Sequence, residues 1–377
     1  MNKAYRIPND FNIYSALSTG RVSDSVLTAL FLRRGIILSN QTDRDSKANY
    51  FATFMHGYYD FVTISAQHSK ADRVEYTSSV NIQTSLDIPQ ISMIMSDLTT
   101  KLDTRFSNIQ LKDIEPNING IANNDLLTVE FEYEKFHPDK QMFSQLEEKK
   151  AAITFKKDKQ TGTYYVEHPA TPEMIKWAAS IQEILKENDK NISINNIDLT
   201  GLTNPELYWQ FFDELTSRID KYKRTNVVEV LFKNPNKDAE DEDESVCQLL
   251  SATYKGNQLH LSEDFKARLD DGYLLHKFSW DCVDDTIKGS DKYRLSIKVT
   301  YDENGKSNFS FISKGFYKHK DGKYSKSINA IPNSKDSEFN RLIFKRGIEL
   351  IDQLTTTPVI SLKNIDTEKG VSDAKEA

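Results

Sequence analysis

The feature that most constrains the fold is a block of strands that leads into one amphipathic helix, within residues 125–186. Apolar and polar side chains alternate through 127–134, with the period of two that is typical of a half-buried strand. Two further β-rich runs, at 152–155 and 164–166, are separated by a short polar loop that ends in Gly162, which is typical of a hairpin. The block therefore predicts a strand, then a hairpin, then a helix.

The predicted helix begins at residue 172 and continues to about residue 186. Thr171 is a favourable N-cap, and Pro172 suits the first helical position because its missing N–H would have no partner there. Apolar side chains then recur at helical spacing and define an inward face. The face comprises Ile175, Ala178, Ala179, Gln182 and Leu185, and Trp177, Ile181 and Ile184 widen it.

The composition is typical of a globular protein, because 38% of the residues are hydrophobic and 28% are charged. A length of 377 residues exceeds what one core usually supports, so we expect two or three domains. The net charge of −7 argues against a surface that is positive overall, but 49 lysines and arginines still allow a local basic patch.

Cysteine, signal and membrane patterns narrow the expected surroundings of the protein. Cys247 and Cys282 are too few for a disulfide framework or a zinc site. The N-terminal stretch lacks the apolar core and cleavage site of a signal peptide, and no apolar run is long enough to cross a membrane. We therefore expect a cytoplasmic protein without a membrane partner.

The sequence predicts an α+β fold, with a helical N-terminal region followed by two mixed strand–hairpin–helix modules. Six carboxylates in the seven residues 238–244 repel one another and predict a mobile loop within the second module. The expected boundaries are 1–120 for the mostly helical N-terminal region, 121–225 for the central α+β module, 226–362 for the β-rich module with its C-terminal helix, and 363–377 for a disordered tail.

Four local expectations concern less regular parts of the pattern. Residues 2–24 predict an irregular lead-in, and 58–64 predict a short extended segment. A helix is expected after Ser23 or Asp24, and another after Thr42 or Asp43, because these residue types are favourable N-caps. Pro205 at a first helical position and apolar residues at steps of four predict a helix that continues to about residue 222.

The first two helices and their link carry a pattern of apolar and basic residues around Gly35, a favourable helix-terminating residue. The pattern comprises Leu27, Leu30, Arg33, Gly35, Ile36, Lys47 and Phe51. Over residues 23–57 it resembles the SAP-type DNA-binding element. The resemblance implies that Arg33, Arg34, Arg44 and Lys47 contact phosphates. The alternative is a packed helical hairpin whose basic residues form a solvated face.

The segment 314–326 interleaves lysines with aromatic rings. A protein that binds a single nucleic-acid strand needs positive charge for phosphates and rings on which bases stack. Lys318, Lys320 and Lys323 belong to a segment that Gly315 and Gly322 delimit, so we expect these lysines on an exposed turn. The predicted nucleic-acid-binding residues here are Lys318, Lys320, Lys323, Tyr317 and Tyr324. The alternative is a lysine-rich hairpin whose rings point into the core.

Glu130, Glu132 and Glu134 are the strongest candidates for catalysis, because the period of two places their carboxylates on one sheet face. Metal-dependent nucleases hold Mg²⁺ and a water with carboxylates and a nearby lysine. Lys135 follows Glu134 directly and is therefore expected on the opposite face. The alternative is an ordinary solvated sheet face without catalytic function.

The sequence contains no phosphate-binding glycine loop, no nucleophile elbow and no zinc-protease motif, so we lean towards a protein without catalytic activity, cofactor or metal. In general texture it resembles accessory proteins of bacterial anti-phage defence and mobile-element islands. We expect a non-catalytic component of a bacterial multiprotein system that associates with nucleic acid or with other protein subunits. The alternatives are a divergent metal-dependent nuclease and a protein-interaction scaffold that binds no nucleic acid.

Overall fold

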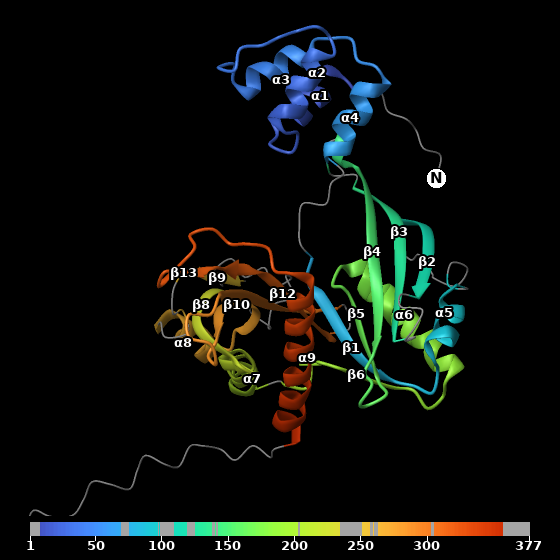
Figure 1. Cartoon of the computed structure of the whole chain (residues 1–377), viewed down its shortest axis with the longest axis vertical. Coiled ribbons are helices and arrows are strands. Elements are labelled where there is room, and N and C mark those ends of the chain that lie inside the picture. The colour runs from blue at the N-terminus through green and yellow to red at the C-terminus, as the bar shows by residue number, and fades with distance from the viewer. Residues whose placement is uncertain are drawn as a thin grey trace, which may run out of the picture. The chain divides into compact units, whose positions relative to one another are not determined.

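The computed structural model divides the chain into two compact units (Figure 1). Unit 1 comprises Met1–Glu75 and Asn81–Ile194, and unit 2 comprises Tyr76–Val80 and Asn195–Ala377. The acidic loop predicted at 238–244 and the tail predicted at 363–377 lie outside the described residues. The structure describes residues 8–68, 75–96, 98, 109–118, 125–137, 140, 142–202, 204–233, 251–256, 259, 263–302 and 305–356.

Helices and antiparallel strands both contribute extensively to these described residues, which confirms the predicted α+β class. The region predicted as mostly helical also supplies two strands, β1 (Thr77–Gln83) and β2 (Ile109–Ile118). Within the described part of the chain, no helix has both the length and the apolar character needed to cross a membrane.

Unit 1 begins with four helices, of which two match the predictions and two correct them. Ser23 caps the second helix and Asp43 caps the third, as expected. The predicted irregular lead-in is wrong, because the side chains of Asn9 and Asn12 cap each other's backbone N–H groups and begin a helix. The predicted extended segment at 58–64 is also helical. The bounds are α1 (Asp10–Ser18), α2 (Asp24–Leu32), α3 (Arg44–Ala52) and α4 (Tyr58–His68).

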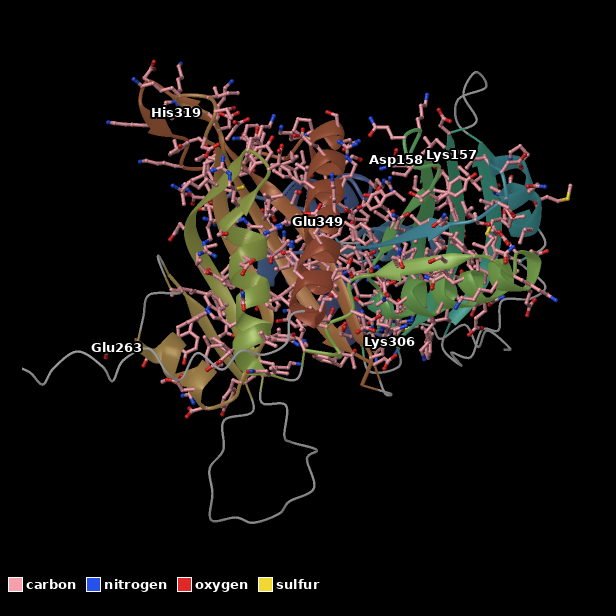
Figure 2. All side chains as sticks on the ribbon, turned by 90° about the horizontal axis from the view of Figure 1, so that it is seen from below. Lys157, Asp158, Glu263, Lys306, His319 and Glu349 are labelled. Atoms are coloured by element: carbon pink, nitrogen blue, oxygen red, sulfur yellow. The ribbon has the colours of Figure 1, made fainter. Side chains whose placement is uncertain are left out.

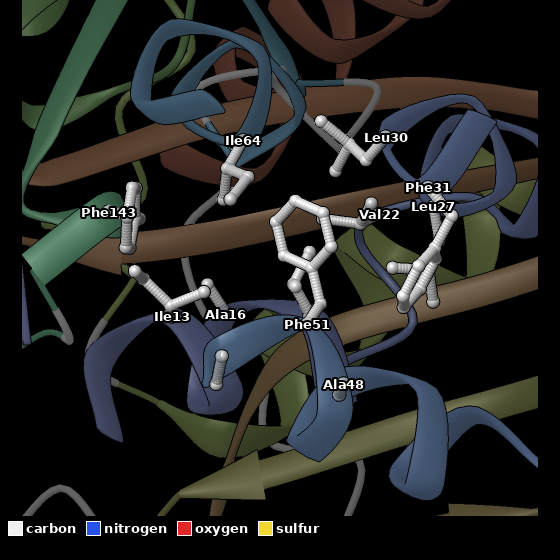
Figure 3. Packing of buried hydrophobic residues seen from close by; sticks show 12 residues of the cluster. Ile13, Ala16, Val22, Leu27, Leu30, Phe31, Ala48, Phe51, Ile64 and Phe143 are labelled. Carbon is white, nitrogen blue, oxygen red and sulfur yellow. The ribbon is translucent and has the colours of Figure 1, made fainter. Parts of the chain in front are cut away.

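The segment of α4 is helical because its buried side chains share one helical face, whereas those of a half-buried strand would occur at every second residue. Ile64 is buried and Phe61, one turn earlier, packs against the same core, which is the spacing of a helix. Phe61 also contacts the ring of Phe143, with 5.2 Å between ring centroids, although Phe143 lies far away in the sequence. Figure 3 shows this core, in which Phe143 from the short helix η2 (Met142–Ser144) packs with residues from all four helices.

The sheet of unit 1 is an antiparallel meander that one long helix covers. The helix α6 (Pro172–Asn188) begins as predicted, with Thr171 accepting a hydrogen bond from the N–H of Met174. Trp177 on α6 stacks on Phe131, with 5.6 Å between centroids, and meets Tyr133 edge to face at 5.0 Å. After β2, the strands are β3 (Leu126–Phe136), β4 (Leu146–Lys157) and β5 (Tyr164–Pro169), and α5 (Ile88–Ser96) contacts β2 and β3.

Unit 2 contains antiparallel strands in the order β12-β11-β10-β8-β7, with β9 paired to β8. Residue Thr77 of β1 pairs with Phe311 of β12. The short strand β6 (Ser193–Asn196) pairs with β1. The other strands are β7 (Arg218–Ile219), β8 (Tyr222–Lys233), β9 (Ser251–Lys255), β10 (Leu274–Asp284), β11 (Lys292–Tyr301) and β12 (Ser307–Tyr317), and the helices are α7 (Pro205–Ser217), α8 (Glu263–Asp270) and α9 (Asn333–Thr356).

The helix α7 ends at Ser217 and not at residue 222 as predicted. Asp220 adopts a left-handed backbone conformation with φ of 53°, so the chain reverses there and Ile219 pairs with Tyr222 across a tight hairpin. The apolar side chains at both positions are buried, as expected, but in strands rather than in a helix.

One face of the unit 2 sheet packs against α7 and α9 (Figure 1). Phe278 of β10 lies against Trp209 and Phe212 of α7, and Tyr293 of β11 meets Phe339 of α9 with 5.0 Å between ring centroids. Successive side chains of a strand point to opposite faces of a sheet. The side chains that alternate with Phe278 along β10 and with Tyr293 along β11 therefore project from the face opposite to α7 and α9. That second face carries the candidate site.

Candidate nucleic-acid interface

The second face of the unit 2 sheet is rich in charged and hydroxyl side chains. Its strands are in register so that Ser279 lies opposite Ser296, and the hydroxyls of these two serines are 2.7 Å apart. We call this surface the polar face. It comprises Glu229 of β8, Lys277, Ser279 and Asp281 of β10, Lys292, Arg294, Ser296 and Lys298 of β11, and Lys314 and Tyr317 of β12.

Glu229 lies at the centre of the polar face between two lysines. Its Oε2 accepts hydrogen bonds from Nζ of Lys277 at 2.8 Å and from Nζ of Lys314 at 3.1 Å. Burial by itself would raise the pKa of Glu229, but the bonds from these lysines outweigh it and lower that pKa to about 2. The carboxylate is therefore ionised at neutral pH and neutralises part of a basic surface.

Asp281 is a second, more deeply buried carboxylate on the same face, with 1% of its surface exposed. Arg294 binds both of its oxygens, through Nε at 2.7 Å and Nη2 at 3.0 Å. This bidentate geometry is the one that the planar guanidinium favours. It holds the Arg294 side chain in place, with the guanidinium carbon 5.1 Å from the centre of the Tyr317 ring.

Lys292 lies between two tyrosine rings at the end of the polar face. Its Nζ is 4.7 Å from the centroid of Tyr317 and 4.9 Å from that of Tyr324, both within the range of cation–π attraction. His319 packs edge to face on Tyr324 at 5.2 Å. We call Lys292, Arg294, Tyr317, His319 and Tyr324 the basic–aromatic cluster.

A two-stranded hairpin of β13 (His319–Lys320) and β14 (Lys323–Tyr324) continues from this cluster. Asp321 and Gly322 form its two-residue turn with φ of 51° and 78°, the backbone of a type I′ hairpin turn. Lys318, Lys320 and Lys323 are exposed, as predicted, but none is in the turn itself: Lys320 and Lys323 are the strand residues on either side of it, and Lys318 precedes β13. Figure 2 shows side chains projecting outwards from this hairpin around His319.

The hairpin depends on Gly315, which has φ of 145° at a bulge in β12. A Cβ atom at this position would lie 2.6 Å from the carbonyl oxygen of Asn329 and 2.5 Å from Cγ1 of Ile328. Glycine therefore allows the chain that follows the hairpin to return beside β12, where Phe316 and Asn329 exchange backbone hydrogen bonds.

The sequence alone did not identify Lys292 and Arg294 as site residues. They belong to β11, whereas the predicted tyrosines lie on β12 and β14. Lys292 is directly opposite Tyr317 in the register of β11 and β12. The sequence showed only that two basic residues alternate at the start of a predicted strand. That pattern does not reveal which strand pairs with it, or which side chains lie opposite.

The basic residues of the SAP-like segment lie in unit 1, two of them directly after α2 and two on α3. Arg34 donates to Asp60 at 2.7 Å and to the carbonyl oxygen of Met55 at 2.8 Å, and it lies over the ring of Phe51. Arg44 donates to three carbonyl oxygens before α2 and to Asp24 at 2.8 Å. Both arginines therefore hold the four helices together.

The other two basic residues of that segment have weaker contacts. Nη1 of Arg33 lies 3.5 Å from the hydroxyl oxygen of Thr63. Lys47 has no ion pair with any residue that the structure describes. A phosphate-contacting role for Arg33, Arg34 and Lys47 stays a prediction.

The glutamates of β3 share one face, as their spacing predicts, but two of the three are paired with lysines. Glu132 pairs with Lys150, and Glu134 pairs with Lys112 at 2.7 Å. Glu134 is buried, which corrects the expectation that the whole face is solvated. Among the described residues no group of three or more His, Cys, Asp or Glu side chains could hold a metal ion. These contacts favour a structural interpretation of the three carboxylates.

Lys135 is on the opposite face of β3, as expected. It pairs with Glu173 of α6, the helix that covers that face, with Nζ and Oε1 2.5 Å apart. Since Lys135 is held there, it is not available to assist the three glutamates as a nuclease lysine would.

Comparison with models of protein families gives no match, and comparison with curated protein sequences gives none either. Among solved structures, the chain is matched to DynU16, a protein in the dynemicin biosynthetic locus, with 7% sequence identity and a TM-score of 0.18. The match covers 74% of this chain and 98% of that one. A similarity at this level supports no inference about function.

Proposed function

We propose that unit 2 binds single-stranded nucleic acid through the basic–aromatic cluster and the β13–β14 hairpin. The observation that supports this function best is the position of Lys292 between Tyr317 and Tyr324, beside an exposed turn that carries Lys320 and Lys323. Single-strand binders combine positive charge along the backbone with rings on which bases stack. Both requirements are met at one end of strands β11 and β12 and in the hairpin that follows them.

The two tyrosines have different exposure and therefore different roles in this proposal. Tyr324 is 41% exposed, so part of its ring is accessible to a base. Tyr317 is less exposed and lies within cation–π distance of Lys292 and Arg294, both of which pair with Asp281, so its role is to hold these two side chains in place beside Tyr324. Because stacking is tolerant of base identity, we expect little sequence preference.

In this proposal the chain is a non-catalytic component of a bacterial multiprotein system, and it presents the bound strand to a partner subunit. The net charge of −7 means that attraction to nucleic acid depends on this local basic surface rather than on the whole protein. The membership of an anti-phage defence system stays a prediction from the texture of the sequence.

The test is fluorescence anisotropy of a labelled oligothymidylate at several salt concentrations between about 50 and 200 mM. The triple variant Lys318→Ala, Lys320→Ala, Lys323→Ala should bind more weakly and lower the slope of log affinity against log salt by roughly two, since each phosphate contact on a single strand contributes about 0.7. Tyr324→Ala should weaken binding by about 1–3 kcal/mol without changing that slope.

A matched control removes the same charge from another part of the surface. Lys186, Lys190 and Lys345 are exposed and have no ion pair among the described residues. Their triple change to alanine should leave both the affinity and the salt slope close to those of the wild type. Wild-type protein that fails to bind the oligonucleotide at about 50 mM salt, or a control that loses as much affinity as the hairpin variant, would overturn the proposal.

A further inference from the structure

The turn between β10 and β11, residues 285–291, lies against the β13–β14 hairpin; we call it the β10–β11 turn. Oδ1 of Asp291 accepts a hydrogen bond from the backbone N–H of His319 at 2.8 Å. A Cβ atom at Gly289 would lie 3.1 Å from both Cε1 and Nδ1 of His319, so the imidazole ring lies directly on the backbone of the turn. The turn and the hairpin therefore meet at two points.

His319 connects this turn to the ring on which a base is proposed to stack. Its imidazole meets Tyr324 edge to face, with 5.2 Å between the ring centroids, and the two residues pair across β13 and β14. Lys292 directly follows Asp291, and its Nζ is 4.9 Å from the centroid of Tyr324. The position of the turn therefore determines where the exposed ring and the neighbouring cation lie.

The β10–β11 turn has its own supports and does not depend on the hairpin for its shape. Oδ1 of Asp284 accepts a hydrogen bond from the N–H of Thr286 at 3.1 Å, and the hydroxyl of Ser290 donates to the carbonyl oxygen of Asp284 at 2.9 Å. An isolated two-stranded hairpin is marginally stable in water. The turn is therefore a fixed support for a hairpin that needs one.

The same turn carries an exposed lysine, Lys288, which has no ion pair with any residue in the described ranges. The carboxylate of Asp285, also on the turn, is bound by Arg218 at 2.9 Å. The Cα atom of Lys288 is about 3.8 Å from that of Gly289, whose backbone the His319 ring contacts. Lys288 is therefore available to bind an anion beside the basic–aromatic cluster.

We propose that the β10–β11 turn forms a second wall of the single-strand site. Gly289 and Asp291 are positioning residues that hold His319 and, through it, Tyr324. Lys288 binds a backbone phosphate of the strand whose base stacks on Tyr324. This role of the turn rests on the proposed function and extends its binding surface beyond the hairpin. Glycine is required at position 289 because φ is 75° and because a side chain would displace the imidazole ring.

The first experiment is a double-mutant cycle of Gly289→Ala and His319→Ala, measured on the full chain by anisotropy of the labelled oligothymidylate and by thermal unfolding. Gly289→Ala should weaken binding by about threefold to tenfold, because the new methyl group displaces the imidazole ring. In the His319→Ala background the same change should have no further effect on affinity. It should still lower the thermal midpoint there, since the strain at a φ of 75° does not depend on His319.

Gly305→Ala is the matched control for backbone strain. Gly305 has φ of 77°, and nothing lies within 4 Å of a Cβ atom placed there. It belongs to the turn between β11 and β12, at the other end of these strands from His319 (Figure 2, beside Lys306). Gly305→Ala should therefore lower the thermal midpoint in the same way and leave the affinity for the oligonucleotide unchanged.

Asp291 is tested by two variants that both remove its charge. Asp291→Asn keeps an oxygen that can accept the hydrogen bond from the N–H of His319, whereas Asp291→Ala does not. The Asn variant should therefore bind the oligonucleotide about twofold to tenfold more tightly than the Ala variant. Equal affinities of the two variants would show that this bond does not position the hairpin.

The role of Lys288 is tested through the salt dependence of binding. Lys288→Ala should weaken binding and lower the slope of log affinity against log salt by about 0.7, because one phosphate contact is lost. The control Lys345→Ala, on an exposed turn of α9, should leave the slope unchanged. An unchanged slope in Lys288→Ala would overturn the phosphate contact, and this variant provides a reading if Gly289→Ala does not fold.

The positioning role is overturned if Gly289→Ala loses no more affinity than Gly305→Ala, or if its loss persists in the His319→Ala background. These outcomes are distinct from failure of the proposed function. If the wild type binds and the triple lysine variant of the hairpin binds more weakly, the proposed function stands without the second wall. If the wild type does not bind the oligonucleotide, the proposed function fails and the second wall fails with it.

Discussion

Glu229 is the carboxylate whose removal most directly tests how negative charge offsets the lysines of the polar face. Its Oε2 is bound by Lys277 at 2.8 Å and by Lys314 at 3.1 Å, and its Oε1 lies 3.9 Å from Nζ of Lys255. The change Glu229→Gln keeps the shape of the side chain and removes its charge. We expect it to weaken the fold of unit 2 and to strengthen the binding of polyanions.

The size of the stability loss follows from the pKa of Glu229, which is lowered from 4.5 to about 2. Each pKa unit corresponds to about 1.36 kcal/mol of folding free energy, so the whole shift would correspond to a stability loss of roughly 3 kcal/mol when the charge is removed. Solvent screens such interactions on a surface that faces water, and we therefore expect about 1–2 kcal/mol at pH 7. For a unit of this size that is a fall in thermal midpoint of about 2–8 °C.

The pH dependence has a definite sign. Because folding lowers the pKa of Glu229, its contribution to stability is complete above pH 4.5 and is lost as the pH falls towards about 2. The stability of the wild type should therefore fall more steeply than that of Glu229→Gln between these two values, and the two curves should converge at the acid end. The assay is denaturant unfolding at a series of pH values, followed by tryptophan fluorescence. Both proteins carry the change Trp177→Phe, so that the signal comes from Trp209 and Trp280 of unit 2 and not from unit 1.

The effect on binding has the opposite direction. Removing one negative charge beside Lys277 and Lys314 makes the polar face more positive, so the oligonucleotide affinity should rise at low salt and the gain should shrink as salt is added. Equal stabilities of the two proteins at pH 7 would refute the reasoning about the fold. A variant that remains folded and binds more weakly than the wild type would refute the reasoning about the surface.

Two further predictions concern a backbone position and the SAP-like segment. Gly315→Ala should destabilise unit 2 by about 1–3 kcal/mol, because φ is 145° and the new Cβ would collide with Ile328 and the carbonyl of Asn329; a thermal midpoint within error of the wild type would contradict this. Arg34→Ala should destabilise the four N-terminal helices by about 1–3 kcal/mol, because it removes the hydrogen bonds of Arg34 to Asp60 and to the carbonyl oxygen of Met55. The control Lys47→Ala should change their stability by less than about 0.5 kcal/mol. Limited proteolysis or hydrogen exchange of these helices measures both effects.

Local chemistry determined the elements with the strongest patterns. Thr171 and Pro172 define the start of α6 without help from the rest of the chain, because an N-cap acts on the first turn alone. The alternation in β3 likewise revealed which side chains are buried, and Phe131 and Tyr133 are indeed in the core. The exposed turn at Lys320 was predictable for the same reason, since its glycine is a local signal.

Elements with competing local signals were decided by tertiary packing. Residues 58–64 contain enough aromatic and β-branched side chains to favour a strand, but Phe61 and Ile64 share one helical face that packs on Phe143. The end of α7 was mistaken because Ile219 and Tyr222 continue the apolar pattern of a helix, whereas they pair across a hairpin. In both cases contacts with distant residues outweighed local propensity.

The sequence by itself determined that this chain forms helices and strands with a basic, aromatic turn near its C-terminal helix. It also placed Tyr317 and Tyr324 together, because they are close in the chain. Only the tertiary structure decided that Lys292 lies between them, and that Asp281 of the neighbouring strand holds Arg294 beside Tyr317. The physical reason is that strand pairing and register depend on contacts between distant segments, and a shift of one residue would turn each of these side chains to the other face.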